Sequence, residues 1–215
     1  MATADVLEGL QRCGIVPILR LKEAGPGVEV CRALVAGGIS TFEVTMGTPN
    51  ALDVIREIRA TFGDSVLVGA GTVLDPETAR LSMAAGAQFL VAPSLNVDLI
   101  RFARRYSLVV IPGALTPTEI VTAWEAGADL VKVFPVRALG PSYLRDLLAP
   151  LPQMRLVPGG GVTIENAGDY IRAGAVAVGV GGELLSSQLI KEGRYDELEA
   201  RARQLVAAIT AARAA

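Results

Sequence analysis

Short apolar runs of strand length alternate eight times with segments of helical hydrophobic period, and this alternation restricts the fold more than any other feature. Several runs are nearly continuous in Val, Ile and Leu, as in parallel strands that helices cover. Strands are predicted at residues 14–20, 41–46, 66–72, 89–94, 109–114, 130–135, 155–158 and 177–181. Helices are predicted at residues 26–38, 51–62, 76–85, 97–106, 117–126, 142–149, 164–173 and 196–214. The order indicates an α/β protein with a parallel sheet.

Local signals at the helix ends support this pattern. Pro76 and Pro117 stand at first-turn positions behind Asp75 and Thr116, whose side chains can accept hydrogen bonds from free helix amides. A glycine suited to a left-handed cap recurs before the next strand, in the tripeptides 36–38, 85–87, 126–128 and 173–175. The helix boundaries are therefore predicted by capping as well as by periodicity.

Two parallel architectures fit such a sequence, a closed eight-stranded barrel and an open doubly wound sheet. Eight regular units in 215 residues match the compact limit of the (β/α)8 barrel, and no G-x-G-x-x-G fingerprint follows the first strand. We therefore expect a (β/α)8 TIM barrel with an extra N-terminal helix at about residues 4–13 that closes its bottom. No linker or low-complexity tract divides the chain, so residues 1–215 are expected to form one domain.

Charge and hydropathy exclude several partners. The chain has 20 Lys and Arg against 22 Asp and Glu, a net charge of −2, which gives no electrostatic footprint for nucleic acid or an anionic membrane. The longest uncharged run, residues 81–97, is interrupted by Gly, Pro and polar residues, so no segment is expected to span a bilayer. The first residues lack a basic segment followed by an apolar core, and a cytoplasmic protein is expected.

Histidine is absent, which removes His-dependent triads, His general bases and His-containing metal sites. Carboxylates, lysine, arginine, hydroxyls and backbone amides remain for any chemistry. Cys13 and Cys31 are too few for a disulfide framework and are expected to act as small apolar residues. We therefore expect no metal-binding residues.

Lys132 is the lysine that the pattern places inside an apolar strand, whereas Lys22 lies in a polar loop and Lys191 near Glu192 and a glycine. One interpretation is structural: the stem packs and the ammonium reaches the rim of the sheet. The other is chemical. An inward lysine of a barrel must either pair with an anion or lose its proton, and a neutral amine attacks a carbonyl to form a Schiff base.

Glu43 is the natural companion of Lys132, because it stands in the second predicted strand with apolar neighbours on both sides. It could form a structural ion pair with an arginine, or it could move protons while an imine forms and decays. Thr72 closes the third strand and offers a hydroxyl beside glycine amides; its alternative role is to begin the turn before Asp75.

Two glycine clusters come late in the chain, at residues 158–161 after the seventh strand and at 179–182 after the eighth. Glycines permit close approach of backbone amides to an anion, and the loops after strands seven and eight are the usual phosphate site of this barrel. Tight turns alone could also explain either cluster.

Between residues 14 and 185 a series of motifs stands at or near the strand ends: Glu43-Val44-Thr45, Gly69-Ala70-Gly71-Thr72, Pro93, Pro112-Gly113-Ala114, Lys132-Val133-Phe134-Pro135 and Gly160-Gly161. In these motifs the sequence resembles the bacterial 2-keto-3-deoxy-6-phosphogluconate aldolases, also called 4-hydroxy-2-oxoglutarate aldolases. The resemblance implies a class I aldolase without metal or cofactor, usually a homotrimer, that acts on a keto acid and yields pyruvate and an aldehyde. It further implies a Schiff-base lysine at Lys132, acid/base chemistry at Glu43, pyruvate-side contacts from Thr72, Pro93 and Phe134, and a phosphate cradle from Gly160, Gly161, Gly181 and Gly182.

Two positions depart from the family pattern. Many members carry Arg where this chain has Gly47, and that guanidinium is associated with the substrate carboxylate, so Arg20 at the end of the first strand is the candidate replacement. Members also tend to have Ser where this chain has Glu183, which puts a negative charge near the expected phosphate. Two other functions stay open: a phosphate-binding barrel isomerase or synthase without an imine, and a noncatalytic ligand-binding barrel.

Overall fold

The computed structural model describes residues 2–214. Its strands are β1 (Ile15–Leu19), β2 (Thr41–Thr45), β3 (Leu67–Gly71), β4 (Phe89–Val91), β5 (Val109–Ile111), β6 (Gly113–Ala114), β7 (Val131–Val133), β8 (Leu156–Pro158) and β9 (Val178–Val180). Its helices are α1 (Thr3–Cys13), α2 (Gly27–Ala36), α3 (Ala51–Phe62), α4 (Pro76–Ala84), α5 (Val97–Arg105), α6 (Pro117–Glu125), α7 (Gly140–Leu148), α8 (Ala167–Arg172), α9 (Ser187–Lys191) and α10 (Tyr195–Ala214). A short 3-10 turn, η1 (Gly63–Ser65), precedes β3.

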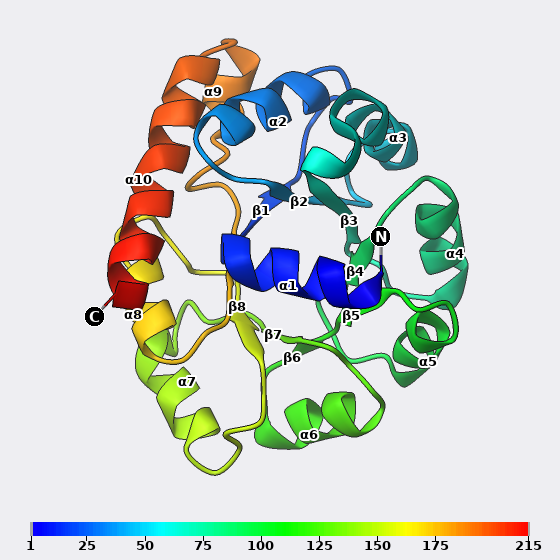
Figure 1. Cartoon of the computed structure of the whole chain (residues 1–215), viewed down its shortest axis with the longest axis vertical. Helices are drawn as coiled ribbons and strands as arrows, with labels where there is room; N and C mark the ends of the chain where they lie inside the picture. The colour runs from blue at the N-terminus through cyan, green and yellow to red at the C-terminus, as the bar shows by residue number, and fades with distance from the viewer. Residues whose placement is uncertain (1, 215) are drawn as a thin grey trace.

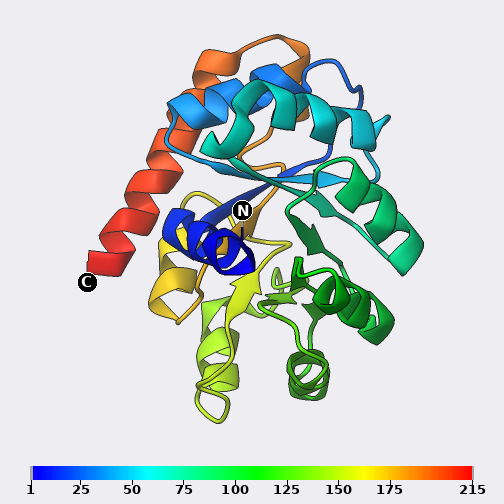
Figure 2. The same cartoon turned by 45° about the vertical axis from the view of Figure 1, so that its right-hand side comes forward.

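All strand pairs are parallel. Six strands lie in the order β5-β4-β3-β2-β1-β9 and three in the order β6-β7-β8. Hydrogen bonds run between the two groups, from Asp129 N, just before β7, to Val110 O of β5 at 3.3 Å and from Val176 N, just before β9, to Leu156 O of β8 at 3.0 Å. The helices form an outer ring around the strands, and Figures 1 and 2 show α1 lying across the middle of that ring. The expected α/β class with parallel strands is confirmed, and the sheet is curled (Figure 1).

Alternate strand residues face two different cores, as the period of two requires. One set packs under the surrounding helices and includes Phe42, Val44 and Val68. The other set lies inside the ring with Val6 and Leu10 of α1, and comprises Val16, Leu67, Phe89, Val91, Val109, Ile111, Leu130, Val157 and Ala177. Inward residues further along β2 and β7 are then Glu43 and Lys132. The apolar set thus packs with α1 inside the ring, whereas β2 and β7 each also contribute an inward charged residue.

Several predicted boundaries are wrong by a few residues. The strand predicted at 109–114 is divided into β5 and β6 at Pro112, which has no N–H to donate to a ladder. The strand predicted at 66–72 stops before Thr72, whose φ of 59° is left-handed. The sequence analysis did not predict α9 or η1, both of which are too short to show a helical period.

The predicted helix caps are confirmed. Asp75 accepts a hydrogen bond from Thr78 N at 2.6 Å, and Thr116 accepts one from Glu119 N at 3.4 Å. Four of the cap glycines have the expected positive φ, namely Gly38, Gly86, Gly127 and Gly174. Among residues 2–214, no helix combines the length and the apolar character needed to cross a membrane.

Candidate active site

Lys132 and Glu43 meet inside the ring of strands. Lys132 Nζ lies 3.6 Å from Glu43 Oε2, and the two side chains are only 8% and 3% exposed. β7 presents the lysine and β2 the carboxylate, each at the middle of a buried strand. The proximity that the sequence analysis predicted for these two side chains is therefore present, with opposite charges compensating each other in a site shielded from water.

Glycine makes room for the Glu43 carboxylate. A Cβ on Gly71 would lie 2.1 Å from Glu43 Oε1 and 2.4 Å from its Cγ, so the carboxylate occupies the space beside the β3 backbone. Gly71 pairs in register with Thr45, two residues after Glu43 on β2. The glycine of the third strand therefore sets where the carboxylate stands relative to Lys132.

Phe134 and two glycines form the wall next to the amine. The Phe134 ring centroid is 5.3 Å from Lys132 Nζ, within cation–π range. A Cβ on Gly159 would be 3.2 Å from Lys132 Cε, and one on Gly160 would be 2.6 Å from the Phe134 ring. The carboxyl ends of β7 and β8 thus enclose the lysine with an aromatic face and with bare backbone.

The predicted phosphate glycines differ in what surrounds them. Gly160 and Gly161 have φ of 71° and 140°, and a Cβ on Gly161 would meet Arg137 Cα at 2.5 Å. Gly181 and Gly182 have ordinary φ, and a Cβ on either would meet no atom within 4 Å. The first pair is required by the turn itself, whereas the second pair faces open space.

The other predicted contact residues follow the carboxyl ends of their strands: Arg20 follows β1, Thr72 follows β3 and Pro93 follows β4. Pro93 is half-buried, and the bare backbone of Gly113 packs against it. Thr72 is half-buried in a strained left-handed conformation of the kind found at functional sites. Arg20 is exposed, and it lines a separate cavity of about 240 Å³ between the loop after β1 and helix α9.

The sequence analysis did not single out Thr45. Its side chain is 1% exposed, and its Oγ1 is the buried side-chain polar atom in residues 2–214 that has no hydrogen-bond partner. Strict alternation along β2 could have signalled that Thr45 faces the same way as Glu43. Its lack of a partner has no signal in the sequence.

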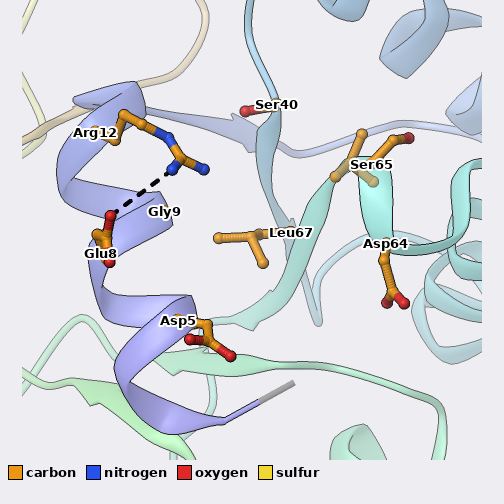
Figure 3. Close-up of a pocket in the computed structure, with 9 residues that line it drawn as sticks. Asp5, Glu8, Gly9, Arg12, Ser40, Asp64, Ser65 and Leu67 are labelled. Atoms are coloured by element: carbon orange, nitrogen blue, oxygen red, sulfur yellow. Dashed lines mark ion pairs between the residues drawn. The ribbon is translucent and has the colours of Figure 1, made fainter.

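A second hollow lies at the opposite end of the strands and is not part of this site. It has a volume of about 200 Å³ and is lined by α1 and by the segments before β2 and β3, including Asp5, Glu8, Arg12 and Asp64. Figure 3 shows Arg12 and Glu8 paired on α1 at its edge. Lys132 and Glu43 are not among its lining residues.

The next question is whether the described residues include a metal-binding cluster or a reactive cysteine. Within residues 2–214 there is no cluster of three or more Asp, Glu or Cys side chains arranged to bind a metal ion. Cys31 is completely buried, and burial raises the pKa of its thiol far above the usual range, so it stays protonated and unreactive. Among residues 2–214, the buried charged side chains are Glu43 and Lys132.

A buried amine next to a carboxylate, inside a ring of parallel strands, is an arrangement used by enzymes that bind carbonyl substrates covalently through lysine. The family model described as KDPG and KHG aldolase matches residues 6–201. The chain belongs to this family.

Relatives and a solved structure agree with that assignment. The chain is 36% identical over 200 residues to the 2-dehydro-3-deoxy-phosphogluconate aldolase of Treponema pallidum (strain Nichols), covering 93% of this chain and 95% of the relative. It is 38% identical over 172 residues to the 2-dehydro-3-deoxy-6-phosphogalactonate aldolase of Escherichia coli (strain K12), covering 80% of each. It is similar, with TM-score 0.87 and 27% identity, to a KDPG aldolase from Legionella pneumophila with pyruvate captured as a covalent carbinolamine, covering 95% of this chain and 98% of that one.

Proposed function

We propose that this protein is a class I aldolase that cleaves 2-keto-3-deoxy-6-phosphogluconate, and also 4-hydroxy-2-oxoglutarate, through an imine on Lys132. The observation that carries the proposal is the 3.6 Å pairing of a buried lysine with a buried glutamate inside a parallel α/β fold. Family membership and the names of the relatives support the reaction class. The products are pyruvate and an aldehyde, glyceraldehyde 3-phosphate from the first substrate and glyoxylate from the second.

Lys132 acts first as a nucleophile. Its neutral amine attacks the C2 carbonyl carbon to form a carbinolamine, which loses water to give the iminium. Glu43, as a carboxylate, takes the proton that the ammonium must lose and returns it to the departing hydroxyl. Because Glu43 Oε2 is 3.6 Å from Nζ, these transfers need a small approach of the two groups or one bridging water.

Bond cleavage follows from the iminium. Removal of the C4 hydroxyl proton lets the C3–C4 bond break, the aldehyde leaves, and the bonding electrons form an enamine between C3 and C2. Protonation of C3 and addition of water then release pyruvate and restore the amine. Glu43 is the base and acid for these steps, since it is the carboxylate that the structure places at the amine.

The remaining predicted residues hold the substrate in this proposal. Phe134 packs against the carbon chain of the keto acid. Thr72, after β3, and Pro93, after β4, contact the pyruvate half of the substrate. Arg20 receives the carboxylate by a movement of its exposed side chain, because Gly47 has no side chain to do so. The amides of four glycines receive the phosphate: Gly160, Gly161, Gly181 and Gly182. Their positions at the carboxyl ends of β8 and β9 support this role.

The proposed substrates differ in the part that leaves as the aldehyde. One relative is named for a phosphogluconate substrate and another for a phosphogalactonate substrate, so the family includes enzymes for more than one sugar acid. The imine requires only the pyruvate half that these substrates share. Activity on 4-hydroxy-2-oxoglutarate is therefore part of the proposal, with the phosphorylated six-carbon acid preferred.

The finer architecture belongs to the same proposal. We interpret the two hydrogen-bonded groups of strands as one closed (β/α)8 barrel, a single domain over residues 1–215, with α1 closing the bottom. The packing of Val6 and Leu10 among inward strand residues supports this role of α1. We also propose a cytoplasmic homotrimer without cofactor. The exposed Leu74 and Leu81, 52% and 57% accessible, support burial of that surface against another subunit.

Borohydride reduction in the presence of pyruvate tests the proposed function. The wild-type protein should gain one reduced adduct on a peptide containing Lys132, and Lys132→Ala should lose both the adduct and the cleavage activity. Lys191→Ala is the matched control and should keep both. An adduct on Lys22 or Lys191, or full activity in folded Lys132→Ala, contradicts the proposal. Retained isomerase or synthase turnover without any adduct would favour the alternative barrel enzyme.

A further inference from the structure

Thr45 carries a polar group that the folded protein does not satisfy. Its side chain is 1% exposed and its Oγ1 has no hydrogen-bond partner among residues 2–214. Buried hydroxyls in native proteins nearly always have a partner, because desolvation without one is unfavourable. An unpartnered hydroxyl in the interior therefore needs an explanation outside the protein's own hydrogen bonds.

The neighbours of Thr45 place it at the proposed active site. Thr41, Glu43 and Thr45 alternate along β2 and share the inward face. Thr45 pairs in register with Gly71, the residue whose bare backbone accommodates the Glu43 carboxylate. A Cβ on Gly47 would lie 4.0 Å from Thr45 Oγ1, so residue 47 places no side chain against this hydroxyl.

Thr41 shows what the same residue type does elsewhere on this strand. Its hydroxyl donates to Ile15 O and also lies 3.6 Å from Cys13 Sγ. Thr48, in the turn after β2, accepts from Leu21 N at 3.2 Å and donates to Leu19 O at 3.3 Å. The hydroxyls of Thr41 and Thr48 therefore form hydrogen bonds within the protein. The hydroxyl of Thr45, which lies between them in sequence, forms none among residues 2–214.

We propose that the Thr45 hydroxyl donates a hydrogen bond to the carboxylate of the bound keto acid; the inference rests on the proposed function. The carboxylate adjoins the carbon that bonds Lys132 Nζ, so it must lie within a few ångströms of that amine. It is repelled by the Glu43 carboxylate, and it has room for a neutral donor besides the proposed guanidinium of Arg20. A hydroxyl without an internal acceptor has its proton free for this contact, and Thr45 follows Glu43 by one inward position, about 7 Å along the strand.

The test compares Thr45→Val, Thr45→Ser and Thr41→Val with the wild type. Val has nearly the shape of Thr without its hydroxyl, and Ser keeps the hydroxyl. Each protein is titrated with pyruvate and with acetone, a ketone without a carboxylate, under borohydride, and the adduct is measured by mass. Melting temperature is recorded without ligand and with pyruvate.

Thr45→Val should raise the pyruvate concentration for half-maximal trapping about tenfold or more, because a hydrogen bond to a charged group is lost. Its acetone titration should stay within about twofold of wild type, and its Tm without ligand should not fall, since no internal hydrogen bond is removed. Thr45→Ser should restore most of the affinity. Thr41→Val should show the reverse, a lower Tm with unchanged pyruvate trapping.

Unchanged pyruvate trapping in Thr45→Val overturns the inference, as does an equal loss for pyruvate and acetone. A Tm loss as large as that of Thr41→Val also overturns it, because the hydroxyl would then have a structural partner. If instead the protein does not form an imine, the wild type itself gives no adduct with pyruvate. In that case the pyruvate-induced rise in Tm, present in wild type and absent in Thr45→Val, still decides whether Thr45 binds the carboxylate.

Discussion

The carboxylate of Glu43 stands where a side chain on Gly71 would be. A Cβ on Gly71 would lie 2.1 Å from Glu43 Oε1, a separation that no pair of nonbonded atoms tolerates. Glu43 is also the partner of Lys132, at 3.6 Å. The position of the proposed base therefore depends on a glycine of the neighbouring strand as much as on β2 itself.

Gly71→Ala should move the Glu43 carboxylate away from Lys132 and lower turnover by about tenfold or more, since a displaced base transfers protons poorly. Steady-state kcat for the proposed cleavage measures the effect. Gly69→Ala is the matched control on β3, because its Cβ would meet the Phe89 ring at 2.4 Å rather than Glu43. The control should lose about 1–3 kcal/mol of stability through overpacking and keep most of its turnover per folded molecule. Equal kcat losses in both variants would contradict the role of Gly71.

Glu43→Gln should lower kcat by about 10²–10⁴, the usual contribution of general acid-base catalysis, because the amide keeps the shape but cannot take a proton. Stability should change less than activity. Thermal melting and kcat are measured on the same preparation. Nearly intact turnover with early melting would show that Glu43 serves as a structural counter-ion of Lys132.

Much of this site follows from the strand period alone. Once the apolar runs are taken as parallel strands, Lys132 and Glu43 must face either the interior or the helices, and neither has a low-energy position among helices without a partner. Because the carboxyl ends of parallel strands meet at one end of the sheet, Thr72, Pro93 and the glycines after the last two predicted strands are expected together at that end. These predictions use local periodicity, which the sequence carries directly.

The features that sequence could not provide depend on contacts between distant strands. The space that Gly71 leaves for Glu43 is defined by β2 and β3 together, and the missing partner of Thr45 by every group around it. Arg20 lines a cavity together with residues of α9, a helix too short to predict. Alternation fixes the face of a residue, but only the folded ring fixes what that residue meets.

The stability of the start of α6 should depend on acid pH through Glu119. Hydrogen bonds from Leu115 N and Thr116 N, both 2.8 Å, hold the pKa of Glu119 below its ordinary value of 4.5. The folded state therefore favours the ionised form, and this contribution is complete above about pH 4.5 and lost as the pH falls through the folded pKa. Glu119→Ala should lower Tm at neutral pH by about 2–4 °C, and the gap should shrink by pH 3. A gap that is constant from pH 7 to pH 3 would contradict this origin.

The variant Gly182→Ala distinguishes two interpretations of Gly182, a phosphate-binding residue and a simple turn residue. Gly182 has an ordinary φ, and the added methyl group would meet no atom within 4 Å, so stability should stay within about 0.5 kcal/mol. If its backbone approaches a phosphate, the methyl group should raise KM for the phosphorylated substrate several-fold while pyruvate trapping at Lys132 stays unchanged. Gly161→Ala, with φ of 140° and a contact of 2.5 Å to Arg137, should instead destabilise the protein. An unchanged KM in Gly182→Ala would remove this residue from the phosphate site.

We expect Glu183 to influence how strongly a phosphorylated substrate is preferred. Its side chain is exposed next to the open glycines Gly181 and Gly182, and its backbone carbonyl is held by Arg201 Nη1 at 2.8 Å. Like charges ~4 Å apart cost about 4 kcal/mol at an effective dielectric of about 20, which is comparable to what a few amide donors return. An exposed carboxylate can turn toward water and avoid most of this repulsion. We therefore expect the wild type to prefer the phosphorylated six-carbon acid over 4-hydroxy-2-oxoglutarate in kcat/KM.

Glu183→Ser removes the charge and leaves a hydroxyl that can donate to phosphate. It should raise kcat/KM for the phosphorylated substrate several-fold and leave that for 4-hydroxy-2-oxoglutarate unchanged, because the second substrate has no phosphate for residue 183 to meet. Raising the ionic strength should weaken the advantage of the serine variant, since salt screens the repulsion that the wild type still has. A wild type without preference, together with a serine variant that gains none, would mean that the glycine clusters serve only as turns.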